Sequence, residues 1–353
     1  MNQKHARVGW LFALLLVLAV PCARAGPLAP EVEACLECHG NETLELPLPS
    51  GESQSLYVDE ATFTKSIHGE TLRCTDCHTD IEGYPHPERT FQNKREFSLA
   101  YYESCKTCHF DQYTKSLDGV HYEYVSKGDS RAPLCVDCHG AHNVAKPNVP
   151  KSRISHTCAR CHPQVYERYS HSVHGKALLE GENGDVPVCT DCHRSHDIED
   201  PRTTAFRLHS PEICAGCHTN KKIMAKYDLS TNVLQSYLED FHGVTAAFLK
   251  EQRGGGGRLT AVCTDCHGVH DILPVNDPRS SVIKANLVTT CRKCHPEANA
   301  NFPAAWLSHY EPSFKKAPLV YLVELFYRFF IPFVVLGLVL QILLHVWRAV
   351  VSR

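Results

Sequence analysis

Residues 35–39 read Cys35-Leu36-Glu37-Cys38-His39, and this C-x-x-C-H pattern occurs nine times in the 353-residue chain. Eighteen of the 19 cysteines fall in these nine pairs, and a histidine follows every pair at once. Histidine makes up only 23 of the 353 residues, so chance would place it after all nine pairs with a probability on the order of 10⁻¹¹. The histidine is therefore part of the motif.

The motif predicts a covalent cofactor. Disulfide frameworks need no adjacent histidine, and zinc ribbons use C-x-x-C pairs in couples, whereas nine is odd. C-x-x-C-H is the attachment signature of haem c (heme c): two thiols form thioethers with the vinyl groups, and the histidine becomes the proximal iron ligand. We predict nine covalent haems, bound by Cys35, Cys38, Cys74, Cys77, Cys105, Cys108, Cys135, Cys138, Cys158, Cys161, Cys189, Cys192, Cys214, Cys217, Cys263, Cys266, Cys291 and Cys294. Their proximal ligands are His39, His78, His109, His139, His162, His193, His218, His267 and His295.

An internal repeat supplies candidates for the second iron ligand. The motifs alternate between two types: in the aspartate motif, C-x-D-C-H, an aspartate precedes the second cysteine, and in the variable motif the two middle residues vary. One repeat consists of a variable motif, a histidine, an aspartate motif and a further histidine. This repeat occurs four times and is followed by half a repeat. Nine histidines occupy the matching positions and are predicted as distal ligands: His68, His86, His121, His142, His174, His196, His242, His270 and His309. The alternative for each is a surface or propionate contact, and it is strongest for His86, which follows His78 by eight residues rather than three. In the half repeat, His309 is expected to serve the haem of His295.

The two ends of the chain carry apolar segments. Residues 1–25 have a basic start, a thirteen-residue apolar run and Ala23-Arg24-Ala25, which is typical of a signal peptide; a retained anchor is the alternative. Residues 318–353 are predicted as a membrane anchor, because Phe329–Trp347 contains no charged residue over nineteen positions. Arg348 and Arg353 favour a cytoplasmic C-terminus, with the haem-binding body in the periplasm. A buried soluble helix is the alternative.

Length and composition bound the fold. A mature chain of 328 residues offers about 36 residues per haem, too few for a conventional core around each cofactor. We therefore expect a mainly α fold with much irregular structure, packed on its haems, plus one C-terminal transmembrane helix. Residues 26–150 are expected to hold four haems and residues 151–317 five. Val233–Phe241 is expected to form the longest soluble helix.

Composition also limits the classes of function. A net charge of −3 excludes a broadly basic nucleic-acid binder, so no nucleic-acid partner is expected. Saturated iron suits electron transfer rather than catalysis, because it leaves no site for substrate. The alternative is a multihaem reductase of a small oxyanion or nitrogen compound, which needs an open iron. His156, His171 and His209 are left over as surface histidines, and Met224 is the only other candidate ligand in the mature chain.

The paired motifs over residues 35–310 resemble the multihaem c-type cytochromes of metal-respiring bacteria. Nine motifs before a membrane segment are similar to the periplasmic part of nine-haem inner-membrane cytochromes, which continue into a b-type cytochrome domain. This chain has one helix there instead. The resemblance implies a separate b-type cytochrome or other quinone-reactive membrane partner, periplasmic c-type cytochromes as soluble partners, and a role in anaerobic respiration. His345, inside the membrane segment, is a candidate ligand for a b-type haem in that partner.

Overall fold

The structure is a computed structural model of the chain. It describes residues 28–69, 71–252, 260–303, 309, 313–315 and 317–351. The predicted signal peptide, residues 1–25, lies outside the described residues.

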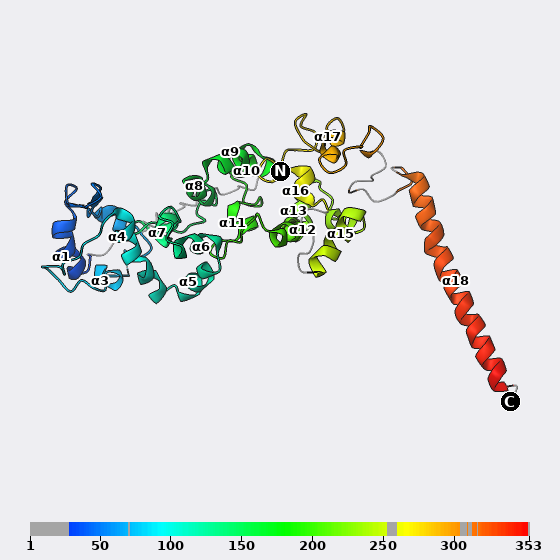
Figure 1. The fold of residues 1–353 in the computed structure, drawn as a ribbon, viewed down its shortest axis with the longest axis horizontal. Coiled ribbons are helices and arrows are strands. Elements are labelled where there is room, and N and C mark those ends of the chain that lie inside the picture. The colour runs from blue at the N-terminus through cyan, green and yellow to red at the C-terminus, as the bar shows by residue number, and fades with distance from the viewer. Residues whose placement is uncertain are drawn as a thin grey trace, which may run out of the picture. The chain divides into compact units, whose positions relative to one another are not determined.

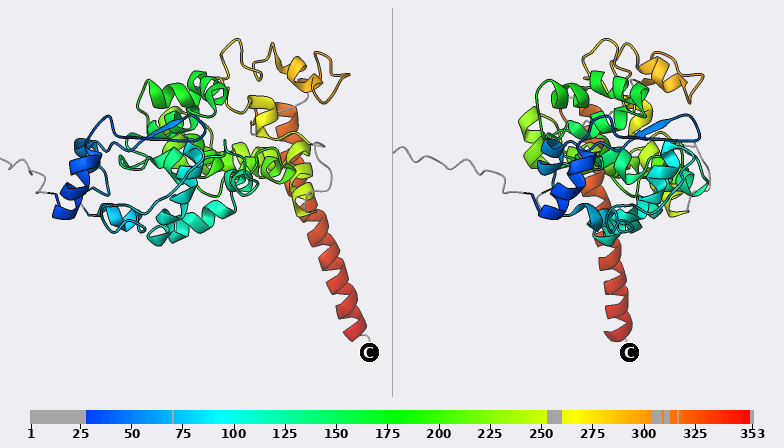
Figure 2. Two further views of the ribbon diagram at one scale, coloured as in Figure 1. Left: turned by 60° about the vertical axis from the view of Figure 1, so that its left-hand side comes forward. Right: turned by 90° about the vertical axis from the view of Figure 1, so that its left-hand side faces the viewer.

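The described chain is mainly helical, which confirms the predicted fold class. Its one sheet is an antiparallel hairpin of β1 (Glu45–Pro47) and β2 (Ser53–Ser55), with Leu46 opposite Gln54. Figure 1 shows short helices joined by long irregular segments, and the two further views in Figure 2 show the same character. Short helices are expected where covalent cofactors, rather than long apolar helix faces, fix the backbone.

The chain divides into two compact units. The first comprises residues 1–104 and 140–145, and the second comprises residues 105–139 and 146–353. In the first unit lie α1 (Pro30–His39), α2 (Glu60–Thr64), α3 (Cys74–Cys77) and α4 (Lys94–Ala100); a 3₁₀ helix, η1 (Tyr102–Thr107), leads into the second. The predicted boundary at residue 150 remains a prediction about haem grouping.

The second unit holds the remaining helices. They are α5 (Phe110–Leu117), α6 (Val120–Ser126), α7 (Cys135–His139), α8 (Arg153–Ala159), α9 (Pro163–His171), α10 (Val173–Leu179), α11 (Cys189–His193), α12 (Thr204–His218), α13 (Lys221–Met224), η2 (Ala225–Tyr227), α14 (Val233–Leu238), α15 (Phe241–Glu251), α16 (Cys263–His267), α17 (Leu287–Arg292) and α18 (Pro318–Val351).

Buried apolar clusters in the described residues are small. In the second unit, α12, α14 and α15 pack together around Leu208, Tyr237, Ala246 and Leu249. A second cluster joins Tyr169, Leu178 and Val188. Four and three buried side chains cannot organise a unit of this size by hydrophobic burial alone. Most of the packing surface must therefore be provided by something other than the side chains.

The helix expected over Val233–Phe241 is wrong in its extent. α14 ends at Leu238, and α15 begins at Phe241. The break arises because the Asp240 side chain accepts hydrogen bonds from the backbone N–H groups of His242 and Gly243, at 2.7 and 3.1 Å, and so caps a new helix. Among the described residues, the longest helix before the C-terminal segment is α12, with 15 residues.

The C-terminal helix α18 has 34 residues and is long and apolar enough to cross a membrane. None of its apolar window is buried against the rest of the chain. At 1.5 Å per residue it extends about 51 Å, beyond the roughly 30 Å of a hydrocarbon core. Residues 319–327 therefore continue the helix outside the charge-free stretch, and Glu324 pairs with Arg328 there at 2.7 Å.

Candidate functional site

The attachment motifs form single helical turns. The proximal histidine donates its backbone N–H to the carbonyl of the first cysteine, four residues back. The distance is 2.9 Å in the motifs of His78, His109, His162 and His295. This bond sets both cysteines and the histidine along one turn. One haem could then meet all three, with the thiols at its vinyl groups and the histidine at its iron.

The aspartate that distinguishes every second motif has a structural role. Its carboxylate accepts a hydrogen bond from the backbone N–H of the residue before the first cysteine, closing the start of the turn. The four bonds are Arg73 to Asp76 (2.8 Å), Leu134 to Asp137 (2.7 Å), Val188 to Asp191 (2.8 Å) and Val262 to Asp265 (2.7 Å). The alternation seen in the sequence is therefore an alternation of helix-capping chemistry.

Sixteen of the predicted histidine ligands come together in eight facing pairs. Every pair joins one proximal and one predicted distal histidine, with ring centroids 6.0–6.3 Å apart. The pairs are His39–His86, His78–His142, His139–His196, His162–His121, His193–His270, His218–His174, His267–His309 and His295–His242.

This separation fits an iron between the rings. Metal–imidazole bonds are about 2 Å long, and a ring nitrogen lies about 1 Å from its centroid, so two ligands in line place their centroids about 6 Å apart. The residues present therefore fit haem held by two histidines.

Burial favours the neutral form of these rings, which is the form that binds a metal. Desolvation and, to a smaller extent, the nearby His218 together lower the pKa of His174 to about 4. Desolvation likewise lowers the pKa of His142 and of His267.

One pairing predicted from the sequence is wrong. His309 was expected to face His295, but its ring lies 6.3 Å from that of His267, and His295 faces His242 at 6.2 Å. Proximity along the chain misled the assignment, because a distal ligand must approach from the opposite side of the haem. Iron ligation itself remains a prediction for all eighteen histidines.

Neighbouring groups orient several of the rings. The Nδ1 atom of His39 lies 2.8 Å from the Leu56 carbonyl, and that of His86 lies 2.8 Å from the Gly83 carbonyl. These contacts leave Nε2 of each ring for a metal. Phe206 stacks on the proximal ring of His193, with the two planes only 2° apart.

The distal histidine His174 sits at a capped helix start. The Ser172 hydroxyl accepts a hydrogen bond from the backbone N–H of Gly175 at 3.0 Å. A Cβ on Gly175 would lie 1.8 Å from the Tyr169 carbonyl oxygen, so only glycine fits. Both His68 and His174 stand in a Ser-x-His-Gly sequence, and the structure supplies the steric reason for the glycine.

The attachment motifs of the second unit follow one another in space in chain order. The thiols of Cys105 and Cys135, of Cys158 and Cys189, and of Cys214 and Cys263 interact as pairs. In the first pair, Cys135 lowers the pKa of Cys105 to about 7. Weaker electrostatic interactions join Cys138 to Cys158, Cys192 to Cys214 and Cys266 to Cys291. Each motif thus adjoins the next.

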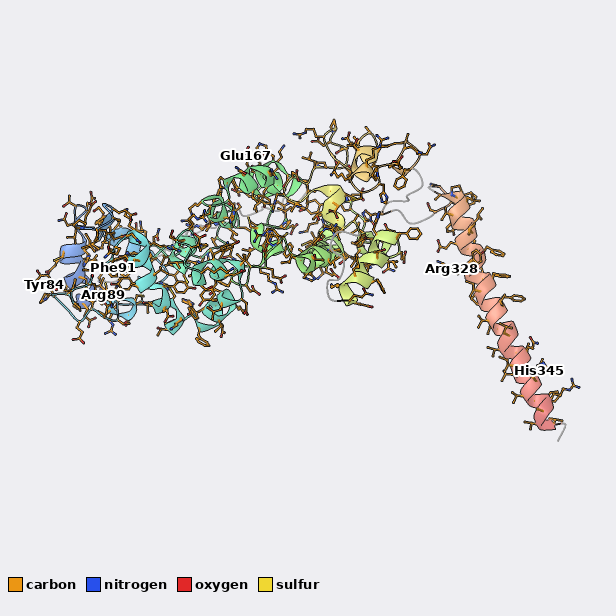
Figure 3. All side chains as sticks on the ribbon, viewed as in Figure 1. Tyr84, Arg89, Phe91, Glu167, Arg328 and His345 are labelled. Atoms are coloured by element: carbon orange, nitrogen blue, oxygen red, sulfur yellow. The ribbon has the colours of Figure 1, made fainter. Side chains whose placement is uncertain are left out.

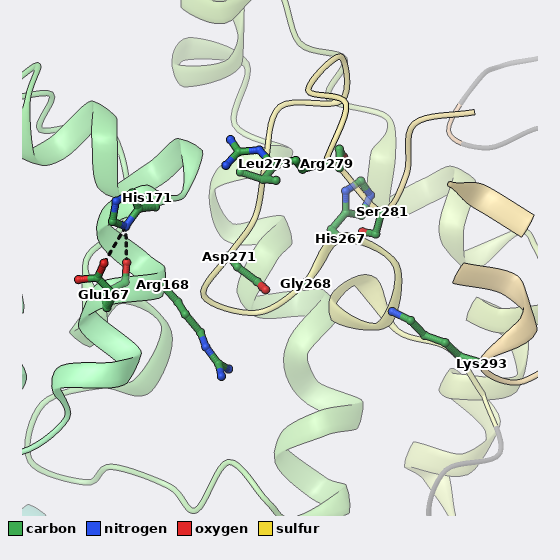
Figure 4. A pocket seen from close by; sticks show the side chains of 11 residues that line it. Glu167, Arg168, His171, His267, Gly268, Asp271, Leu273, Arg279, Ser281 and Lys293 are labelled. Atoms are coloured by element: carbon green, nitrogen blue, oxygen red, sulfur yellow. Dashed lines mark hydrogen bonds and ion pairs between the residues drawn. The ribbon is translucent and has the colours of Figure 1, made fainter. Parts of the chain in front are cut away.

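A cavity of about 410 Å³ borders the proximal ring of His267 (Figure 4). Three cationic side chains contribute to its lining: Arg168, Arg279 and Lys293. Glu167 and Asp271 also line it. A cavity with a positive lining beside a proximal histidine suits the carboxylate-bearing edge of a haem.

The histidines predicted not to be ligands have other neighbours. His171 lies 3.5 Å from the Glu167 carboxylate, and His209 lies 3.7 Å from that of Glu212. His156 contacts the ring of Tyr166. Met224 is buried. His345 lies toward the C-terminal end of α18, and Arg328 toward its start (Figure 3).

The C-x-x-C-H motifs indicate covalent haem c, and their number is consistent with a multihaem c-type cytochrome. A family model described as "Doubled CXXCH motif" matches residues 125–166 and 180–223. Each matched segment contains an aspartate motif followed by a variable motif. No solved structure matches the chain.

Proposed function

We propose that this protein is a periplasmic nonahaem cytochrome anchored in the inner membrane, and that it carries electrons between a quinone-reactive membrane partner and periplasmic c-type cytochromes in anaerobic respiration. The observation that carries the proposal is the set of eight histidine pairs with centroids 6.0–6.3 Å apart. When bound, haem c supplies one-electron redox chemistry at its iron.

The residues of the chain determine what that chemistry is used for. The paired histidines would hold the haem iron between them and would leave no ligand position on it for substrate or water. We therefore propose that the protein is not an enzyme. In the second unit, each attachment motif adjoins the next in chain order, which favours stepwise passage of electrons along that unit.

The membrane end is proposed as the port to the quinone-reactive partner. Nine residue steps separate His309 from Pro318, the start of α18, so extended chain can separate them by at most about 32 Å. The motif of His267 is tied to this segment through His309, whose ring lies 6.3 Å from that of His267. α18 would anchor the protein and dock a b-type cytochrome or similar subunit, with His345 available to it.

Ligation is tested first. Oxidised full-length protein should show low-spin iron throughout, and the reduced protein should bind almost no carbon monoxide. A substantial high-spin fraction in the wild type would contradict the proposal and favour a reductase.

The port is tested in membranes that contain the partner. Removing residues 319–353 should abolish haem reduction by quinol while the soluble protein keeps all its haems. His345→Ala is the matched variant that leaves the anchor in place. It distinguishes docking of the partner by α18 from ligation of a b-type haem by His345. Normal quinol-driven reduction of the truncated protein would contradict the port assignment.

A further inference from the structure

The histidine pairs of the second compact unit follow one rule. A proximal histidine of a variable motif faces a distal histidine from the preceding repeat, as in His162–His121, His218–His174 and His295–His242. A proximal histidine of an aspartate motif faces one from the following repeat, as in His139–His196, His193–His270 and His267–His309. In the first compact unit, His78 and His142 obey the same rule.

A repeated backbone hydrogen bond holds the two ligand-bearing segments together. At each junction, two distal histidines lie on neighbouring segments, one from each repeat. The residue just before the histidine of the earlier repeat donates its backbone N–H. The acceptor is the carbonyl of the residue two positions after the histidine of the later repeat. The bonds are Val120 to Ile198 (2.8 Å), Val173 to Ile272 (2.8 Å) and, in the first unit, Ile67 to Val144 (2.9 Å). Three occurrences at the same offset show that the junctions share one register.

Local ligation is the competing arrangement, and the ring positions oppose it. His270 follows His267 by three residues, yet its ring lies 6.0 Å from that of His193 in the preceding repeat. His267 faces His309 instead. The histidine nearest to His267 in the sequence is therefore His270, but the histidine that faces it in space is His309.

We infer that consecutive repeats exchange their distal ligands, so that the two haems at each junction are each completed by the neighbouring repeat. This inference rests on the proposed bis-histidine ligation and assigns the ligand of each iron. A haem on an aspartate motif then keeps an open axial position until the next repeat has been made and folded against it. Ligation consequently locks the repeats into a single assembly in chain order.

The test asks which iron opens when one distal histidine is removed. In full-length protein, His270→Ala should make one iron in nine high-spin and able to bind carbon monoxide. Its location is read with a spectral marker: Cys189→Ala or Cys263→Ala leaves one haem on a single thioether, and one conjugated vinyl group then shifts the α-band of that haem alone.

Ligand exchange predicts that carbon monoxide changes the shifted band in His270→Ala/Cys189→Ala and leaves it unchanged in His270→Ala/Cys263→Ala. The reverse result would overturn ligand exchange while preserving bis-histidine ligation. Absence of any high-spin iron in His270→Ala would instead contradict bis-histidine ligation at this position.

The design also includes a control variant and a second test at the haem of a variable motif. His171→Ala removes a ring that lies beside Glu167 rather than another histidine, and it should leave every iron low-spin. If His270→Ala does not mature, His174→Ala with the marker at Cys214 applies the same test to the variable-motif haem. In His174→Ala/Cys214→Ala, the shifted band must respond to carbon monoxide. If the band responds only in His174→Ala/Cys158→Ala, the inference is overturned.

Discussion

Replacing Gly175 by alanine should open one haem iron without touching any ligand. The new Cβ would lie 1.8 Å from the Tyr169 carbonyl oxygen, whereas real Cβ contacts are essentially never shorter than 3.0 Å. The start of α10 must therefore move by at least about 1.2 Å. This helix carries His174, whose ring faces that of His218 at 6.3 Å. An iron–imidazole bond of about 2 Å cannot stretch by that amount.

We expect about one iron in nine to become high-spin, and the fold to lose about 1–3 kcal/mol through overpacking. Electron paramagnetic resonance of the oxidised protein measures the first effect, and carbon monoxide uptake by the reduced protein gives the number of open haems. Thermal unfolding measures the second effect.

Gly184→Ala is the matched control. An added Cβ there meets nothing within 4 Å, so spin state and stability should both stay at wild-type values. If Gly175→Ala binds no more carbon monoxide than the Gly184 control and unfolds at the same temperature, the steric argument for the Ser-x-His-Gly turn is refuted.

Three further predictions concern the cofactors, the anchor and the surface charges. Intact mass should show nine covalent haems on a chain beginning near Gly26; fewer than eight on correctly processed protein would contradict the motif count. Deleting residues 319–353 should move the protein to the soluble fraction with its haem content unchanged, and retention in membranes would mean that α18 is not the anchor. The Arg279 side chain lowers the pKa of Asp277 to about 2, so the ionised carboxylate contributes stability that is present above about pH 4 and lost as pH falls toward 2. Asp277→Asn should therefore be less stable than the wild type at pH 6, with the difference vanishing near pH 2 in thermal unfolding; a constant difference would exclude this carboxylate as its source.

The sequence could predict a set of histidines of which sixteen face one another in the structure, but not how they pair. Counting repeats identified the set, because haem attachment constrains both the motif and the number of ligands. Pairing depends on which side of a haem a segment approaches, and spacing along the chain carries no information about that. His309 shows the difficulty: it is the nearest unassigned histidine after His295, yet it faces His267.

Local capping chemistry likewise decided details that apolar periodicity missed. The apolar pattern from Val233 to Phe241 predicts one helix, but Asp240 offers its carboxylate to two backbone N–H groups and starts a second helix there. The C-terminal segment was predicted more successfully, because a long charge-free run leaves few alternatives. Its helix extends further, to Pro318, since Glu324 and Arg328 pair across one turn without interrupting it.

Ligand exchange also accounts for the irregular spacing of His86. In the second compact unit, the proximal histidine of a variable motif faces a histidine from the preceding repeat, as in His162–His121, His218–His174 and His295–His242. The structure pairs His39 with His86 from its own repeat, with ring centroids 6.1 Å apart. His86 is also the one distal histidine that follows an aspartate motif by eight residues rather than three in the four full repeats. The unusual position of His86 in the sequence therefore matches a change of partner. In the other repeats the corresponding histidine faces a proximal histidine of the preceding repeat, whereas His86 faces His39, in the first motif of its own repeat.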